Sequence, residues 1–319
     1  MSASALPTAP DRRLVVGKAV EIADGVRRVL APNANMMTGP GTNTYLVGAS
    51  HVACIDPGPA DDAHLDAVAE AARGRLRWIL VTHTHSDHSP GAVGLAQRTG
   101  ARLIGFGPML RPGVEGHDDT FTTDLAVRDG FTIALPGGFV LRAVHTPGHA
   151  SNHLCWMLGD ALGTGGHGLL FSGDHIMDGS TVVIAPHDGR MGEYLASLDR
   201  LLTLPMRAIA PGHGHRIDDP YDRVQEYIRH RRSREAMVVE HLVRLFDEQP
   251  ADPVTGARGI GISALVAAIY VGVPEQLHPV ALYSVWAHLQ KLAQGGCVET
   301  TDRDDITSRW WPAPHLLKS

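Results

Sequence analysis

A strand of the buried type that runs directly into clustered histidines constrains this chain more than any other feature. The apolar segment LRWILVTHT, residues 76–84, has the composition of a strand in a sheet interior. It leads into THTHSDHSPG, residues 82–91, where three histidines and one aspartate fall within six positions: His83, His85, Asp87 and His88. Protonated histidines at this spacing would repel one another. The segment is therefore either a solvated loop or a binding site.

Similar residues follow three other predicted strands. FVLRAVHTPGH ends at His149, GLLFSGDH contains Asp174, and MRAIAPGHGH contains His213. Strand ends on one side of a sheet converge, which is where α/β folds place their sites. His83 and His85 are two positions apart, so an extended backbone directs both side chains the same way. The pattern predicts that these residues meet.

Imidazole nitrogens and carboxylate oxygens suit zinc, with a Zn–N distance of about 2.0–2.1 Å. We assign three ligands to one ion (His83, His85 and His149), three to a second (Asp87, His88 and His213), and one bridging ligand (Asp174). Two ions about 3.5–4 Å apart share a hydroxide that forms near neutral pH. The sequence therefore predicts two Zn²⁺ per chain, with Mn²⁺ or Fe²⁺ as alternatives for similar ligands. The predicted catalytic residues are Asp87 and Asp174.

Strand and helix patterns alternate along most of the chain. Residues 14–56 predict paired antiparallel strands, and residues 61–73 predict a helix. Ser89 followed by Pro90 predicts a serine-capped helix start, and GTGGHG, residues 163–168, predicts a loop. Many neighbouring strands are joined as hairpins. This order favours a layered α/β sandwich with two mixed sheets and helices outside.

The composition changes after residue 217. Residues 218–249 predict one long charged connecting helix. ISALVAAIY and PVALYSVWAHLQKLAQGG follow as two helices, and CVETT and TSRWWPA as a strand pair. Helix, helix and a two-stranded wing is the order of a winged helix. We predict a domain at residues 1–217 that holds the ligands, the connecting helix, and a winged-helix-like domain at residues 250–319.

These motifs resemble those of the metallo-beta-lactamase-fold hydrolases. HTHSDH is similar to their HxHxDH motif, and His149, Asp174 and His213 match the remaining ligands. The resemblance implies a four-layer αββα sandwich, with Asp56 of CIDPG supporting the metal-binding loop. NANMMTGPGTNTYLVG, HTPGHASNH, EYIRHRRSRE and the winged helix resemble the beta-lactamase-like protein 2 branch, which includes an endoribonuclease acting on single-stranded RNA.

Four further residues are candidates for supporting or substrate-binding roles. His153 and His175 lie close to ligands in sequence, which suggests contacts that orient them. Arg231 and Arg234 belong to the basic run RHRRSRE and share a helix face, with Glu235 as a partner for Arg231. Such a run is commonly a solvated helix face. In the alternative interpretation, an arginine here holds a substrate carboxylate or phosphate.

Charge bears on the choice of substrate. The net charge is −6, and residues 218–319 carry 11 Lys and Arg against 14 Asp and Glu, whereas a DNA-reading wing is usually basic. We therefore expect the winged helix to pack over the catalytic cleft or to form a subunit contact, as in a homodimer.

The leading hypothesis is a dinuclear hydrolase of a small ester, thioester or lactone. Single-stranded RNA is the alternative and needs a basic path, through Arg231 and Arg234. β-Lactams are least favoured, because Asp174 stands where the resemblance implies a cysteine or serine in antibiotic-hydrolysing enzymes. A non-catalytic metal-binding interaction protein is a third hypothesis, although such degeneration normally removes ligands and none is missing.

Three features predict a cytoplasmic protein without a membrane partner. The three cysteines are odd in number and far apart, which is not a disulfide framework. The N-terminal sequence lacks the apolar core of a secretory signal. No apolar run approaches the length of a membrane span.

Overall fold

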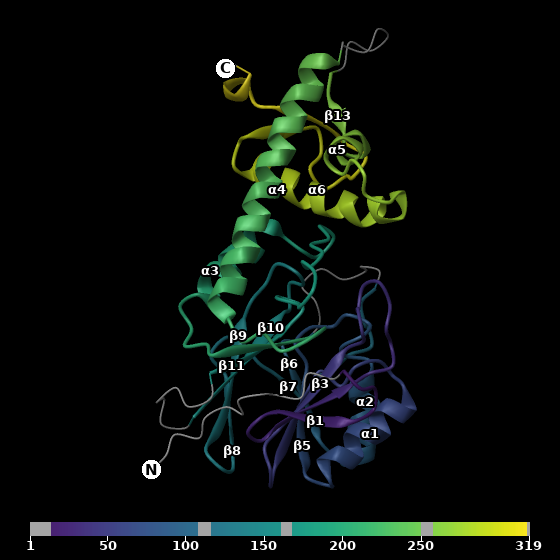
Figure 1. Ribbon diagram of the computed structural model, residues 1–319, viewed down its shortest axis with the longest axis vertical. Helices are drawn as coiled ribbons and strands as arrows, with labels where there is room; N and C mark the ends of the chain where they lie inside the picture. The colour runs from purple at the N-terminus through teal and green to yellow at the C-terminus, as the bar shows by residue number, and fades with distance from the viewer. Residues whose placement is uncertain (1–13, 108–115, 161–167, 250–257, 318–319) are drawn as a thin grey trace.

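A computed structural model describes residues 14–107, 116–160, 168–249 and 258–317 (Figure 1). Its first sheet has seven strands in chain order. They are β1 (Ala19–Ala23), β2 (Val26–Leu30), β3 (Asn43–Val47), β4 (Val52–Ile55), β5 (Leu76–Leu80), β6 (Arg102–Gly105) and β7 (Leu125–Ala126). Strands β1 to β4 pair antiparallel and β4 to β7 pair parallel. The parallel crossovers run through α1 (Asp62–Ala72) and α2 (Gly91–Thr99).

The second sheet has five strands in the order β12-β11-β10-β9-β8. They are β8 (Thr132–Leu135), β9 (Phe139–His145), β10 (Leu154–Asp160), β11 (Leu169–Gly173) and β12 (Ala208–Pro211). Only β11 and β12 are parallel, and α3 (Met191–Leu201) connects them. Both sheets are therefore mixed, as predicted.

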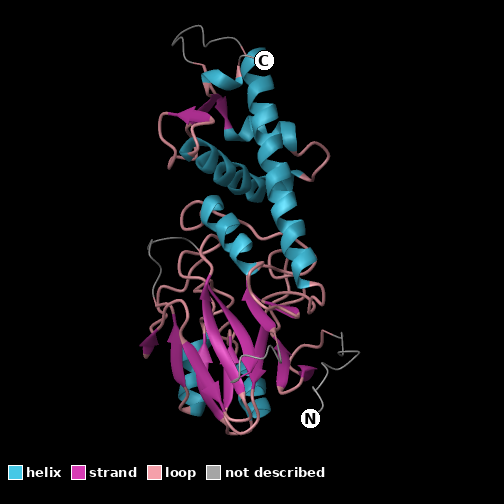
Figure 2. Ribbon diagram, turned by 90° about the vertical axis from the view of Figure 1, so that its left-hand side faces the viewer, coloured by secondary structure: helices cyan, strands magenta, loops and turns pink. Residues whose placement is uncertain are grey.

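The two sheets pack face to face through a continuous apolar core (Figure 2). Tyr45 of the first sheet meets Phe171 of the second, with ring centroids 5.1 Å apart. Helices α1 and α2 pack on the outer face of the first sheet. Helix α3 packs on the outer face of the second. These layers form the predicted αββα sandwich.

Helix α4 (Pro220–Glu248) joins the sandwich to a smaller C-terminal unit (Figure 1). Its first half packs against the second sheet through Val224 and Ile228, and its second half packs into the C-terminal core through Val238 and Leu242. The unit contains β13 (Ile260–Gly261), α5 (Ile262–Ile269), η1 (Glu275–Leu277), α6 (His278–Gln294), β14 (Val298–Thr300), β15 (Arg309–Pro312) and η2 (Pro314–Leu316). Because α4 enters both cores, the sandwich and the C-terminal unit are held together by one rigid element.

Two local predictions are corrected by the structure. The side chain of Ser89 does not cap α2, because its hydroxyl donates to Asp118 at 2.8 Å and Pro90 occupies the cap position. The predicted two-stranded wing has a third strand. β15 lies in the middle and pairs with β14 on one side and with β13 on the other. The loop predicted at residues 163–168 lies outside the described residues, apart from Gly168. Among the helices that the structure describes, none is both long and apolar enough to cross a membrane.

Candidate metal centre

The predicted ligands all follow strand ends on one side of the sandwich. The loop after β5 carries His83, His85, Asp87 and His88, and His149 follows β9. Asp174 is the residue after β11, and His213 lies two residues after β12. The carboxyl ends of β5, β11 and β12 thus bring together side chains that are far apart in the sequence, from His83 to His213.

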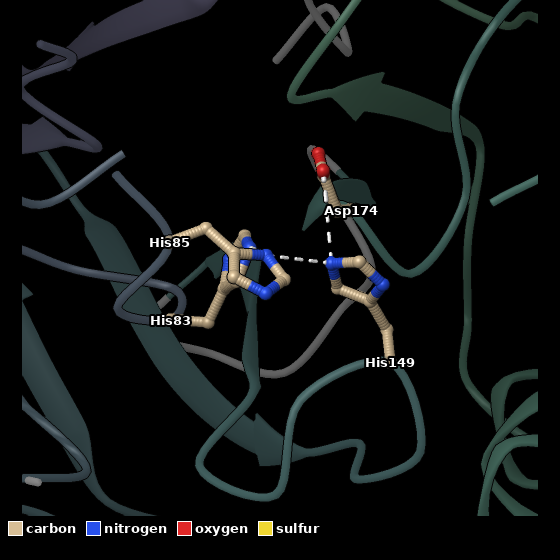
Figure 3. A group of neighbouring side chains, drawn as sticks. All are labelled: His83, His85, His149 and Asp174. Atoms are coloured by element: carbon tan, nitrogen blue, oxygen red, sulfur yellow. Dashed lines mark hydrogen bonds and ion pairs between the residues drawn. The ribbon is translucent and has the colours of Figure 1, made fainter. Parts of the chain in front are cut away.

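The first group contains His83, His85, His149 and Asp174, whose ligand atoms all lie within 4.8 Å of one another. Nδ1 of His85 lies 2.7 Å from Nε2 of His83 and 2.9 Å from Nε2 of His149. Nε2 of His149 lies 3.7 Å from Oδ2 of Asp174 (Figure 3). Three ring nitrogens and one carboxylate oxygen therefore converge on a single point.

The second group contains Asp87, His88 and His213, again with ligand atoms within 4.8 Å. Nε2 of His88 and Nε2 of His213 lie 3.3 and 3.2 Å from Oδ2 of Asp87. Both nitrogens also lie 3.3 Å from Oδ1 of Asp174. Asp174 thus directs one oxygen towards each group, which is the geometry expected of a bridging carboxylate.

Neighbouring groups fix the orientation of the ligand histidines. Nδ1 of His149 donates to the Val183 carbonyl at 2.8 Å, and Nδ1 of His213 donates to the Gly41 carbonyl at 3.1 Å. A carbonyl only accepts, so each Nδ1 carries a proton and each Nε2 is directed at the centre. This is the arrangement that a metal-binding histidine requires.

Asp56 supports the ligand loop in two ways. Its Oδ2 lies 2.9 Å from Nδ1 of His88, and its Oδ1 accepts the backbone N–H of Thr82 at 2.7 Å. The Thr82 hydroxyl in turn lies 2.9 Å from Nδ1 of His83. Asp56 therefore lies beside the predicted metal-binding loop, as the family resemblance implies. It contacts His88 of the second group directly and His83 of the first group through Thr82.

The donor set fits a cation. Nε2 of His88 and Oδ1 of Asp174 are buried and have no hydrogen-bond partner among the described residues. Buried polar atoms of this kind are costly unless a proton, water or ion satisfies them. Nitrogen and carboxylate oxygen are ligands that zinc, manganese and iron accept.

The two groups differ in charge. Burial lowers the pKa of His83, His85 and His149, so these imidazoles are neutral ligands. Burial also opposes a charge on His213, but Asp174 and Asp87 raise its pKa to about 10. A proton on His213 therefore balances the negative charge of Asp87 and Asp174, as a bound cation would.

Comparisons with known proteins agree with this geometry. The metallo-beta-lactamase superfamily matches residues 37–213, a range that contains all the ligands. The chain belongs to this superfamily. The beta-lactamase associated winged helix domain matches residues 262–310, which confirms the predicted winged helix.

Individual relatives share nearly the whole chain. A Drosophila melanogaster protein named beta-lactamase-like protein 2 homolog is 33% identical over 296 residues, covering 89% of this chain and 93% of its own. A Caenorhabditis elegans protein of the same name is 30% identical and covers 88% of each chain. A solved beta-lactamase domain protein from Burkholderia ambifaria has the same fold, with a TM-score of 0.75, 20% identity and 97% coverage of both chains.

His153 and His175 lie behind the ligands rather than bonded to them. The ring centroid of His153 lies 5.0 Å from that of His83, and its Nδ1 lies 2.9 Å from the Thr146 hydroxyl. The ring of His175 packs on Tyr194 at 4.7 Å, and burial lowers its pKa to about 3. Neither ring makes a described hydrogen bond to a ligand, so the structure supports a packing contact in place of the expected orienting bond.

The arginines do not lie where the sequence suggested. Arg231 is buried, and its guanidinium donates to the Val182 carbonyl. Arg234 lies over the ring of Tyr270, 4.8 Å from its centroid. The predicted pairing of Arg231 with Glu235 is wrong, because both Glu235 oxygens accept from Lys291 at 2.7 and 2.8 Å.

The candidate metal centre opens into a cavity of about 500 Å³. Five ligands line its base: His85, Asp87, His149, Asp174 and His213. The sides include six apolar residues that we call the apolar wall: Met36, Met37, Val182, Leu277, Val280 and Tyr283. Three of these, from Leu277 onwards, belong to the C-terminal unit, which therefore packs over the cleft as expected. Among the described lining residues there is no lysine or arginine.

Sequence reasoning missed His117, which also lines this cavity. Its ring centroid lies 4.3 Å from that of His85. The segment around it pairs with the ligand loop, where Ser86 N–H donates to the Gly116 carbonyl at 3.0 Å and Asp118 N–H donates to the Thr84 carbonyl at 2.7 Å. No strand-end pattern precedes His117 in the sequence, so only the fold reveals this position.

Proposed function

We propose that this chain is a dinuclear metal-dependent hydrolase, with two Zn²⁺ ions, that acts on a small ester, thioester or lactone. The two ligand groups and the divided contacts of Asp174 support the pair of ions. A pair of divalent cations in such positions supplies a nucleophile from water near neutral pH and polarises a carbonyl group. The carboxylates of Asp87 and Asp174 lie beside His88 and His213. Their negative charge favours the binding of a cation by the second group.

The observation that carries the substrate class is the lining of the cavity. Its described residues combine five predicted ligands with an apolar wall and contain no lysine or arginine. A polyanion such as RNA needs cationic side chains along its path. A neutral acyl substrate needs only an apolar surface and access to the metal centre, and this cavity offers both.

Metal analysis followed by a substrate panel tests the proposal. Elemental analysis of the gently purified protein is expected to give close to two metal ions per chain. Zinc-loaded protein should hydrolyse nitrophenyl esters, thioesters or lactones faster than bis-nitrophenyl phosphate or short RNA. Faster cleavage of RNA would support the endoribonuclease alternative. Full metal occupancy with no turnover of any substrate would support a non-catalytic metal-binding protein.

A further inference from the structure

We infer that the C-terminal unit forms the acyl-chain binding surface of the metal centre, and that the substrate carries an apolar acyl group long enough to reach Leu277, Val280 and Tyr283. This inference rests on the proposed function and specifies its substrate class. These residues line the same cavity as His149 and Asp174. A substrate whose reacting carbonyl lies at the ligands therefore directs its remaining atoms towards this surface.

The sequence of α6 separates its two faces. Val280 and Tyr283 are three positions apart, so they lie on the same side of the helix, and Leu277 precedes them by the same interval. Val285, Trp286 and Leu289 lie on other sides of α6 and are buried in the C-terminal core. The cavity-facing residues are half-buried. They line the cavity and can contact a ligand there, and Tyr283 also packs against the C-terminal core.

The position of this surface is fixed by contacts with the sandwich. The ring of His187 lies against those of Tyr283 and Trp286, with centroids 5.8 and 5.4 Å apart. His187 belongs to the loop that also supplies Val182 to the cavity. Arg231 of α4 holds the Val182 carbonyl. The loop and the C-terminal surface thus form a preformed wall, which lowers the entropic cost of binding.

Tyr227 of α4 provides a second anchor for the same loop. Its hydroxyl accepts the Met177 N–H at 3.0 Å and donates to the Ser180 carbonyl at 2.6 Å. Tyr227 is itself buried in α4. The loop is therefore held by α4 and by the ring contacts of His187 with the C-terminal unit.

Met36 and Met37 line the same cavity and are 69% and 51% exposed. Methionine is flexible and polarisable, which suits contact with apolar ligands of variable shape. A cavity of about 500 Å³ is in the size range that encloses small-molecule ligands. Apolar contacts from both the N-terminal methionines and the C-terminal unit favour an extended acyl chain or a ring over a polar headgroup.

Binding of neutral amides to the zinc-loaded protein tests this inference separately from catalysis. Calorimetry with butanamide, hexanamide and octanamide should show affinity rising by about fourfold per added methylene until the cavity is filled. Val280→Phe should reduce the affinity of the longest amide most, because the larger side chain occupies its space. Val271→Phe is the matched control, since Val271 is 82% exposed and does not line the cavity.

The outcomes are distinct. Affinity that does not depend on chain length, or that Val280→Phe and Val271→Phe change equally, would overturn the acyl-binding surface. Hydrolysis of a matching nitrophenyl ester series should show the same length dependence in kcat/KM, with the optimum displaced to shorter chains in Val280→Phe. If no ester is hydrolysed while amide binding follows the expected pattern, the proposed hydrolase function fails and the binding surface stands.

Discussion

The base and the wall of the cavity are built by different physical means. At the base, the ligands are held by specific hydrogen bonds, as in the donation from His149 to Val183 and the contact between His88 and Asp56. The side chains of the apolar wall are held mainly by packing, its two methionines are exposed, and the hydrogen bond from Arg231 holds the Val182 backbone. Directional bonds fix the positions at which charge must be placed, whereas packing fixes only shape. In the proposed function, the base therefore supplies the chemistry and the wall the selectivity.

The largest expected effect is on the base. Asp174→Asn removes a negative charge that contacts both ligand groups, so turnover should fall by about a thousandfold or more for every ester, whatever its acyl length. Steady-state kinetics on a short and a long ester, together with metal analysis, measure this. If Asp174→Asn hydrolysed esters at the wild-type rate while it bound one ion or none, the assignment of the chemistry to the base of the cavity would be contradicted.

The support of Asp56 gives the next effect. Asp56→Asn should weaken metal binding by about 10- to 100-fold, because the contact to His88 loses its charge. Competition with a chelator measures the affinity. Asp24→Asn, at an exposed aspartate, is the control. Equal affinities in the two variants would show that Asp56 does not act through the ligand.

A change at Arg231 should affect the wall. Arg231→Met leaves the Val182 carbonyl without its donor and should lower the free energy of unfolding by about 1–3 kcal/mol. We expect KM to rise more for long than for short acyl esters, and by the same factor for neutral and anionic substrates. Arg232→Met, at the exposed neighbour, should change neither quantity. A selective loss of anionic substrates would instead restore the anion-binding role suggested by the sequence.

The smallest effect at neutral pH concerns His64 of α1, which is buried and lies 2.9 Å from the Thr44 hydroxyl. Burial lowers its pKa to about 4, from about 6.5 in the unfolded chain. Between these values the unfolded chain binds a proton that the folded chain does not, so stability falls as pH drops from 6.5 to 4. The total is about 3 kcal/mol.

His64→Gln removes this titration. Chemical denaturation of both proteins between pH 7 and pH 4 should show a shallower loss of stability in the variant. Parallel curves would mean that His64 is protonated equally in both states.

The ligand set and the sandwich were predictable because both depend on local pattern. Alternating strands and helices place strand ends at one edge, and the ligand residues stand at those ends, as in HTHSDH after β5. The winged helix was predictable for the same reason, since α5 and α6 have clear helical periodicity. The serine cap at Ser89 failed because a tertiary partner, Asp118, competes for its hydroxyl.

The roles of Arg231, His117 and the apolar wall depended on contacts between distant segments. The run RHRRSRE looks the same whether an arginine faces solvent or a carbonyl, and burial of Arg231 follows from how α4 crosses the loop that contains Val182. The wall joins residues near position 36 to residues near position 280. Periodicity shows which face of a helix is apolar, but the element that this face meets is decided by the packing of the whole chain.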